Sequence, residues 1–244
     1  MAIVWKPPGL LIHPSNEAPD AYTLMHLVRN TLQQHVFPVH RLDRQTSGLV
    51  VFGLNSDAAS QLNQQFRDKR VKKGYLALVR GFFTEELISL DRPVRPKREK
   101  KAYPAQTHFN LLCKSEKPWP VGSYEKARFS LVLAQPLSGR RHQIRKHLKH
   151  LKHPIIGDRM YGDGHYNKLI DAHFGWNRMM LTSVYLKLKS PFEDTTQEFY
   201  AICDEHFMEL LEMFFTDVKT SNVQRMVHDI MGLDNDVRMR VTSC

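Results

Sequence analysis

A polar stretch with the sequence HRLDRQTSG, residues 40–48, places one carboxylate among basic side chains. Asp43 lies close in sequence to His40, Arg41 and Arg44. Nearby positive charge favours the ionised carboxylate, and an ionised aspartate can act as a nucleophile or as a general base. The alternative is structural, because an aspartate in a turn commonly forms salt bridges and caps backbone amides. For an isolated aspartate in a loop, the structural alternative is the more frequent one.

Two apolar segments enclose this stretch and must position it. Residues 36–39 (VFPV) precede it, and residues 49–52 (LVVF) follow it. The second segment is short, contains β-branched residues and is flanked by Gly48 and Gly53, which predicts a buried strand. Reacting groups are commonly carried by loops on a rigid scaffold. The sequence therefore predicts that Asp43 lies in a fixed loop between two segments of the core.

A second strand is predicted around Tyr75. In residues 75–79 (YLALV), alternation places Tyr75, Ala77 and Val79 on one face. A tyrosine in such a strand most often belongs to the core, with its hydroxyl group hydrogen-bonded. Further strands are predicted at residues 106–113, 124–135, 181–189 and 197–202.

A basic amphipathic helix is predicted within residues 138–161, with Ile144, Leu148 and Leu151 on its buried face. A cationic stripe lies beside that face: Arg141, Arg145, Lys149 and Lys152. The structural alternative for this stripe is a solvated surface. Four histidines in the block could suggest a metal site, but lysine and arginine are interleaved with them and no cysteine or acid completes a ligand set. A metal site is therefore not expected.

The stretch HRLDRQTSG, followed by an apolar strand, resembles the active-site signature of the RluA-type pseudouridine synthases. Three further blocks resemble the family in the same order: KPPG at residues 6–9, KGYLALVRG at 73–81, and GRRHQIRKHL with HPIIGDRMY between 139 and 161. The resemblance spans residues 3–192. It implies an α+β pseudouridine synthase fold, with a mixed, largely antiparallel sheet, flanking helices and a central RNA-binding cleft. Family members usually have a further strand before the first block, so a truncated N-terminus is expected.

The resemblance implies roles for five residues. Asp43 is the catalytic residue that attacks the target uridine, and Arg41 helps to hold the base out of the helix. Tyr75 stacks on the flipped uracil and is a candidate proton acceptor, Ile144 packs beside the uracil, and Arg145 pairs with Asp43. No metal or organic cofactor is implied, because the base stays in the pocket and no redox change occurs.

Two segments are similar to a branch of the family that acts on tRNA: QHVF at residues 34–37, and HFG at 173–175 ahead of MML at 179–181. This similarity implies uridine 65, at the end of the T stem, as the substrate. The alternatives are a ribosomal-RNA pseudouridine synthase of the same family and a non-catalytic RNA-binding protein. The intact Asp43, Tyr75 and Arg145 argue against the latter, because binding alone would not require them.

The charge of the chain indicates its partners. It has 35 Lys and Arg against 25 Asp and Glu, a net charge of +10, which favours nucleic acid or an anionic surface. Residues 91–106 form a basic connection that is either a solvated loop or a phosphate-tracking segment. No apolar run approaches the length of a membrane-spanning helix. The expected protein is a cytoplasmic monomer that binds RNA, in particular tRNA, with no DNA and no membrane partner.

The 244 residues are divided by the sequence into a catalytic domain, residues 1–203, and a helical extension, residues 204–244, packed on it. Apolar residues at helical spacing predict two helices in the extension, one from Phe207 to Phe215 and one from Val223 to Met231. The three cysteines, Cys113, Cys203 and Cys244, are far apart and are expected to be reduced thiols.

Overall fold

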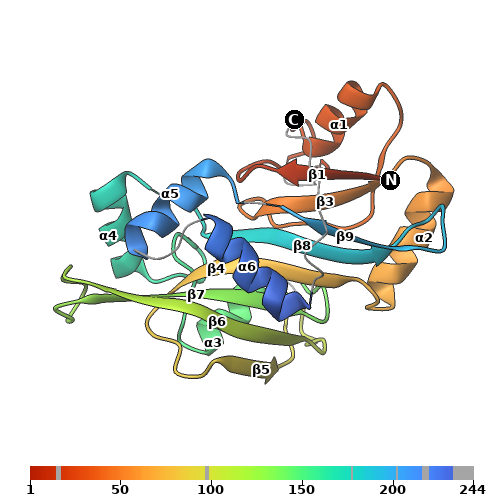
Figure 1. Ribbon diagram of the computed structural model, residues 1–244. Helices are drawn as coiled ribbons and strands as arrows, with labels where there is room; N and C mark the ends of the chain where they lie inside the picture. The colour runs from red at the N-terminus through yellow and green to blue at the C-terminus, as the bar shows by residue number, and fades with distance from the viewer. Residues whose placement is uncertain (15–17, 97–98, 177, 202, 216–219, 233–244) are drawn as a thin grey trace. The chain divides into compact units, whose positions relative to one another are not determined.

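The computed structural model describes residues 1–14, 18–96, 99–176, 178–201, 203–215 and 220–232 of the chain (Figure 1). These residues fold into two compact units. The first contains residues 1–73 and 183–201, and the second contains residues 74–182 together with the described part of 202–237. Cys244 and the other residues after 232 lie outside the described part, while Cys113 and Cys203 are free thiols.

Strands of the first unit surround the segment that follows Asp43. They are β1 (Ala2–Lys6), β2 (Phe37–Pro38), β3 (Ser47–Gly53), β8 (Leu181–Lys189), which belongs to this unit from Ser183 onward, and β9 (Thr196–Tyr200). Both β1 and β2 pair antiparallel with β3, β8 lies next to β3, and β9 pairs antiparallel with β8. Every residue of β3 is buried, which confirms the strand predicted at residues 49–52.

Two helices accompany these strands, α1 (Leu24–Leu32) and α2 (Ser56–Arg67). The core of the unit joins Leu49 and Val51 of β3 to Leu62 of α2 and Leu186 of β8. Burying such aliphatic side chains stabilises the fold by about 1.5–3 kcal/mol for each one. The strand that leaves the Asp43 loop is therefore firmly anchored.

In the second unit, antiparallel strands follow the order β4-β7-β6-β5. They are β4 (Lys72–Arg80), which belongs to this unit from Gly74 onward, β5 (Leu87–Asp91), β6 (Gln106–Lys117) and β7 (Ala127–Pro136). Its helices are α3 (Gln143–His150), α4 (Gly164–Phe174), α5 (Glu205–Phe214) and α6 (Thr220–Met231). The protein is thus α+β with mostly antiparallel strands, as predicted.

The helices of the second unit pack on β6 and β7. Helix α3 contacts β7, whereas α5 and α6 contact β6. The ring of Phe214, on α5, lies 4.4 Å from that of Phe129 and 5.8 Å from that of Trp119. The two helices predicted after residue 204 are therefore present, and the domain boundary between residues 203 and 204 stays a prediction.

Candidate active site

The loop that carries Asp43 is fixed through its backbone. The N–H of Thr46 donates to the carbonyl of Asp43 at 3.0 Å, which closes a turn. Arg44 and Gly9 exchange two hydrogen bonds: the N–H of Gly9 donates to the Arg44 carbonyl at 2.8 Å, and Nε of Arg44 donates to the Gly9 carbonyl at 2.8 Å. The turn at the end of β1 thereby holds the Asp43 loop from outside it.

Lys6 secures the same contact from the interior. Its side chain is fully buried, and its ammonium group donates to the carbonyls of Pro7 at 2.8 Å, Leu10 at 2.9 Å and Arg44 at 3.0 Å. A buried ammonium group requires such acceptors, because an uncompensated charge in the interior is very costly. Lys6 is therefore a positioning residue for the backbone next to Asp43.

Gly48 allows two strands to approach each other where the loop ends. Its φ angle of +111° lies in a region that residues with a side chain rarely adopt. A Cβ atom at this position would lie 2.1 Å from the carbonyl oxygen of Ser183 on β8. The glycine of the HRLDRQTSG stretch is thus required by both its backbone conformation and the close approach of β8.

His40 adds no positive charge near Asp43, which corrects the interpretation of the sequence. Its Nε2 accepts a hydrogen bond from the N–H of Val51 at 3.0 Å, and its ring stacks on Phe66 at 4.6 Å. Burial, together with the charge of Lys73, lowers the pKa of His40 to about 3. The imidazole is therefore neutral and structural, while Arg41 and Arg44 are the exposed cations of the loop.

Three of the predicted site residues belong to the second unit. Tyr75 is buried on β4, where it lies opposite Ala134 of β7. Ile144 and Arg145 occupy the first turn of α3 and are also buried, with exposed fractions of 7% and 8%. The structure therefore places Asp43 and Arg41 together in one loop of the first unit, and Ile144 and Arg145 side by side in the second.

Gln143 fixes the start of α3. Its Oε1 accepts from the hydroxyl of Ser138 at 2.7 Å and from the N–H of Arg140 at 3.0 Å. Its Nε2 donates to the carbonyl of Gln106 at 2.9 Å and to the hydroxyl of Thr107 at 3.0 Å. All four atoms belong to β6 or to the loop before the helix, so Gln143 sets the position of the residues that follow it.

His147 continues this network. Its Nε2 lies 2.9 Å from the carbonyl of Arg92, so this nitrogen carries the proton, and Nδ1 accepts from the Thr107 hydroxyl at 2.9 Å. Burial lowers the pKa of His147. Both ring nitrogens are thus used within the fold.

Among the described residues, no group of three or more His, Cys, Asp or Glu side chains is arranged to hold a metal ion.

Arg145 forms a buried, two-point ion pair with Asp158. Its Nε and Nη2 donate to the two carboxylate oxygens at 2.7 and 2.8 Å. The carboxylate also accepts from the backbone N–H groups of Met160 at 2.9 Å and Tyr161 at 3.0 Å. Burial opposes ionisation, but these hydrogen bonds and the charge of Arg145 outweigh it, so the pKa of Asp158 lies below its ordinary value.

The cationic stripe of α3 is therefore divided in two. Arg145 is buried, so the structural alternative of a solvated face is wrong for this residue. Arg141, Lys149 and Lys152 are exposed, and the solvated surface describes them correctly. Exposed cations of this kind can approach phosphate groups, whereas Arg145 can act only on a group that reaches the interior.

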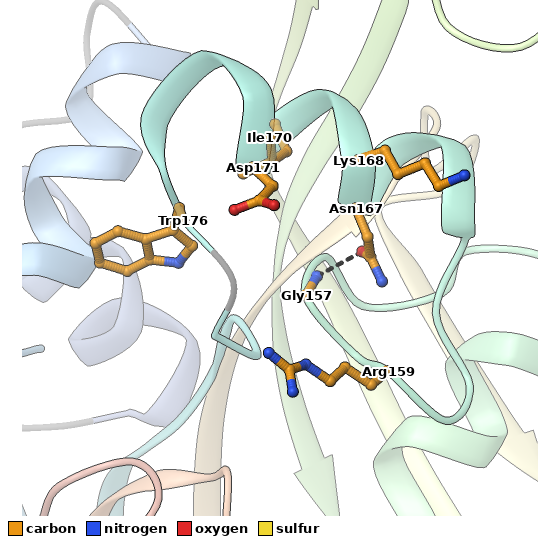
Figure 2. Close-up of a pocket in the computed structure, with 7 residues that line it drawn as sticks. All are labelled: Gly157, Arg159, Asn167, Lys168, Ile170, Asp171 and Trp176. Carbon is orange, nitrogen blue, oxygen red and sulfur yellow. Dashed lines mark hydrogen bonds between the residues drawn. The ribbon is translucent and has the colours of Figure 1, made fainter.

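A pocket lies between α4 and the loop that holds Asp158 (Figure 2). Asn167 projects from α4 toward Gly157, and its side-chain oxygen accepts from the Gly157 N–H at 2.8 Å. Arg159 and Lys168 line this pocket together with Asp171, so its charge is mixed.

None of the helices in the described part of the chain has the length and apolar character that a membrane span requires.

The contacts that Lys6, Gln143 and Asp158 make were not predicted from the sequence. Each of these residues lies in a block that resembles the family, which was the available signal. Their partners are backbone carbonyls or side chains brought close only by the fold, and residue types alone did not identify them.

Comparisons with known proteins agree with the architecture. The profile of a family described as RNA pseudouridylate synthase matches residues 1–150. The chain is 39% identical over 225 residues to tRNA pseudouridine synthase C of Haemophilus ducreyi, covering 87% of this chain and 92% of that protein. It is also 39% identical over 225 residues to tRNA pseudouridine synthase C of Salmonella typhi, covering 88% and 86%.

Solved structures show the same fold. Human RNA Pseudouridylate Synthase Domain Containing 1 superimposes with a TM-score of 0.66 and 25% identity, covering 93% of this chain and 94% of that one. Human RNA Pseudouridylate Synthase Domain Containing 4 gives a TM-score of 0.65 at 22% identity, covering 86% and 88%. The residues that match the family profile include the Asp43 loop, the Tyr75 strand and Arg145 of α3. Together with the similarity to the curated relatives, this match shows that the chain belongs to the RNA pseudouridylate synthase family, whose members isomerise uridine in RNA.

Proposed function

We propose that the protein converts one uridine of tRNA, uridine 65 at the end of the T stem, to pseudouridine. The observation that carries the choice of tRNA is the likeness to tRNA pseudouridine synthase C, which extends over 87% of this chain and 92% of the relative. A likeness of this extent spans exposed residues as well as the core. The protein is proposed to act as a cytoplasmic monomer on RNA and not on DNA.

Capture of the RNA is assigned to exposed cations. Arg41 and Arg44 lie beside Asp43, and three more lie just before α3, on it and just after it: Arg141, Lys149 and Lys152. Contacts to phosphates supply affinity and position the RNA without reading its sequence. The target uridine must then leave its stack, since a base inside a helix is out of reach. Arg41 is proposed to help hold the extruded base.

Asp43 is proposed as the nucleophile. Its carboxylate bonds transiently to the base or to ribose C1′ and is released again before the product leaves. The bond between uracil N1 and ribose C1′ breaks, the uracil rotates, and a bond forms between uracil C5 and C1′. The hydrogen on C5 leaves as a proton and N1 gains one, so the product is an isomer of the substrate and no redox partner is needed. The backbone contacts of Lys6 and Gly9 to Arg44 support this role, because a nucleophile must be held in place to react efficiently.

Tyr75, Ile144 and Arg145 are proposed to act on the base and on the carboxylate. Tyr75 stacks on the uracil and is the candidate acceptor of the C5 proton, while Ile144 packs beside the ring. Arg145 pairs with Asp43 and places a positive charge beside its carboxylate. The burial of all three side chains supports these roles, because hydrogen bonds and charges act more strongly where water is excluded.

The experiment that tests the function is a map of pseudouridine in RNA from cells that lack the protein, made by mass spectrometry. We expect uridine 65 of certain tRNAs to lose its modification and to regain it when the wild-type chain, but not Asp43→Asn, is supplied. Loss of a ribosomal-RNA pseudouridine instead would assign the alternative substrate. An unchanged map in both RNAs would contradict a role in modification and favour an RNA-binding protein.

A further inference from the structure

Arg145 is held along one edge of its guanidinium group. The donors on Nε and on the adjacent side of Nη2 both meet Asp158, at 2.7 and 2.8 Å. The two side chains are 10% and 1% exposed. A two-point pair of this kind fixes the plane of the guanidinium as well as its distance from the carboxylate.

Stability alone is a weak reason for such a pair. Removing two charges from water is costly, and buried ion pairs can often be replaced by apolar residues without loss of stability. Asp158 is nevertheless fully engaged, because it also accepts from the N–H groups of Met160 and Tyr161. Since its pKa lies below the ordinary value, the carboxylate stays charged at neutral pH and the pair stays intact.

The backbone that carries Asp158 is itself held in place. Asn167 of α4 accepts from the Gly157 N–H at 2.8 Å, the contact drawn in Figure 2, and donates to the Asp158 carbonyl at 3.1 Å. Gly157 has a φ angle of +76°, and a Cβ atom there would lie 1.8 Å from the Arg178 carbonyl oxygen. The carboxylate therefore has little freedom to follow Arg145 if the arginine moves.

An aromatic ring limits Arg145 on another side. The Cζ atom of Arg145 lies 5.0 Å from the centroid of the Tyr161 ring, a distance at which a guanidinium is attracted to an aromatic face. The hydroxyl of Tyr161 is 3.1 Å from Nδ1 of His142, which holds the ring. Asp158 fixes one edge of the Arg145 guanidinium, and the Tyr161 ring lies close to it. The directions of the remaining donors, on Nη1 and on the outer side of Nη2, are therefore fixed as well.

We propose that Asp158 is a positioning residue for pseudouridine formation, which aims the outer donors of Arg145 at the reacting carboxylate. The inference rests on the proposed function of Asp43 and Arg145. Asp158 itself touches neither RNA nor the reacting atoms. Its contribution is that Arg145 is already oriented before the uridine arrives, so no rotamer search is needed in the reaction step.

The test compares Asp158→Asn with Asp204→Asn in single-turnover kinetics on a tRNA transcript. Asp204 is the matched control, because it also forms a two-point pair, with Arg178 at 2.7 and 2.8 Å, in the same unit. Loss of orientation by about 1 Å can cost about 100-fold in rate. We therefore expect Asp158→Asn to slow the chemical step by roughly 10- to 100-fold with little change in Kd for RNA. The control should lose stability only. Equal rates for Asp158→Asn and the wild type would overturn the proposal.

A double-mutant cycle shows whether Asp158 acts through Arg145. Asp158→Asn should slow the reaction much less in an Arg145→Lys background than in the wild type, because lysine has no fixed fork of donors to orient. If Asp158→Asn slows the reaction by the same factor in both backgrounds, the two residues act independently and the proposal is overturned. If Asp158→Asn does not fold, Asn167→Ala takes its place: it releases the backbone of residues 157–158 and leaves the ion pair intact. It should then slow the chemical step, and an unchanged rate would count against the proposal.

A spectroscopic measurement separates this inference from the proposed function. The Nε–H of Arg145 should give a slowly exchanging ¹⁵N resonance in the wild type, identified by its loss in Arg145→Lys. Exchange should become faster in Asp158→Asn and not in Asp204→Asn. If the wild type modifies no RNA, the proposed function fails while this measurement still reports on the orientation. If the resonance is unchanged in Asp158→Asn, the positioning role is wrong whatever RNA is modified.

Discussion

The ammonium group of Lys6 donates a 3.0 Å hydrogen bond to the carbonyl oxygen of Arg44, the residue that follows Asp43. A side chain at the end of β1 thus fixes the backbone beside the proposed nucleophile, 38 residues away in sequence. Lys6 also donates to the carbonyls of Pro7 and Leu10, so a single buried charge joins the first turn of the chain to the Asp43 loop.

Lys6→Met is expected to loosen this junction. Hydrogen bonds from a charged donor contribute about 1.5–3 kcal/mol each, and the carbonyls would be left buried without the ammonium group, so we expect a loss of roughly 2–5 kcal/mol of unfolding free energy. Turnover should fall together with hydrogen-exchange protection of the Thr46 amide. Chemical denaturation and exchange mass spectrometry measure both effects. Lys72→Met, which replaces an exposed lysine, is the control, and equal losses for the two variants would remove the special role of Lys6.

Asp43→Asn tests the nucleophile. The substitution keeps the shape of the side chain and removes its charge, so the protein should fold and bind RNA normally. Turnover should drop by at least about four orders of magnitude, comparable with the loss of a nucleophile in other enzymes. Release of tritium from C5-labelled uridine measures the reaction. Measurable turnover by a sample shown by mass spectrometry to be free of deamidation would exclude Asp43 as the nucleophile.

Regular structure around the site could be predicted from the sequence because its signals are local. An apolar, β-branched run between two glycines identified β3, and the strand predicted at residues 181–189 has the bounds of β8, Leu181–Lys189. Strand β6 is longer than predicted, ending at Lys117 instead of residue 113. The additional residues, 114–117, are polar because one face of the strand is exposed there, so they show no hydrophobic pattern.

The supports of the site could not be predicted, because their partners are distant in sequence. The sequence showed Lys6 only as part of a proline- and glycine-rich turn, and its acceptors are backbone carbonyls that exist in every residue. Asp158 is one acid in a basic block, and it lies beyond the end of α3, 13 residues after its partner Arg145. The sequence predicts a cation at His40 for the same reason, since the burial of His40 against Phe66 depends on how α2 packs.

RNA affinity is expected to depend on the basic connection between β5 and β6. Lys100 and Lys101 are exposed there, while Lys97 and Arg98 lie outside the described residues. Reversing both charges with Lys100→Glu and Lys101→Glu should weaken binding and reduce the slope of log K against log salt by about 1.4–1.8, if each lysine meets one phosphate. The modified uridine should stay the same. A shift to another uridine would show that this segment reads the shape or sequence of the RNA.

Gly48→Ala is expected to damage the strand that follows Asp43. The added Cβ would lie 2.1 Å from the Ser183 carbonyl oxygen, and φ would have to remain near +111°. Backbone strain and overpacking each cost about 1–3 kcal/mol, so a loss of roughly 2–5 kcal/mol is expected. Gly164→Ala is the control, because a Cβ there would meet no atom within 4 Å. Similar midpoints of urea unfolding for the two variants would contradict the close approach of β3 and β8.

Lys73 should give the protein a pH-dependent stability above neutrality. Burial lowers the pKa of Lys73 from 10.5 to about 8. Below pH 8 the lysine is charged in both states, and the folded state carries the full cost of burying that charge. Between pH 8 and 10.5 the folded state releases the proton while the unfolded state keeps it, so the unfolded state binds more protons and stability rises with pH. The total rise is about 3 kcal/mol, from 1.36 kcal/mol for each pKa unit.

The measurement is the free energy of unfolding of the wild type and of Lys73→Met from pH 7 to 10.5. Methionine has no titrating group, so the variant should be more stable than the wild type at pH 7, and the difference should shrink as the pH approaches 10.5. Lys72→Met, at the exposed neighbouring position, corrects for the general effect of losing one positive charge. A difference between wild type and Lys73→Met that stays constant over this range would mean that Lys73 keeps an ordinary pKa, and that its charge is compensated in the folded protein.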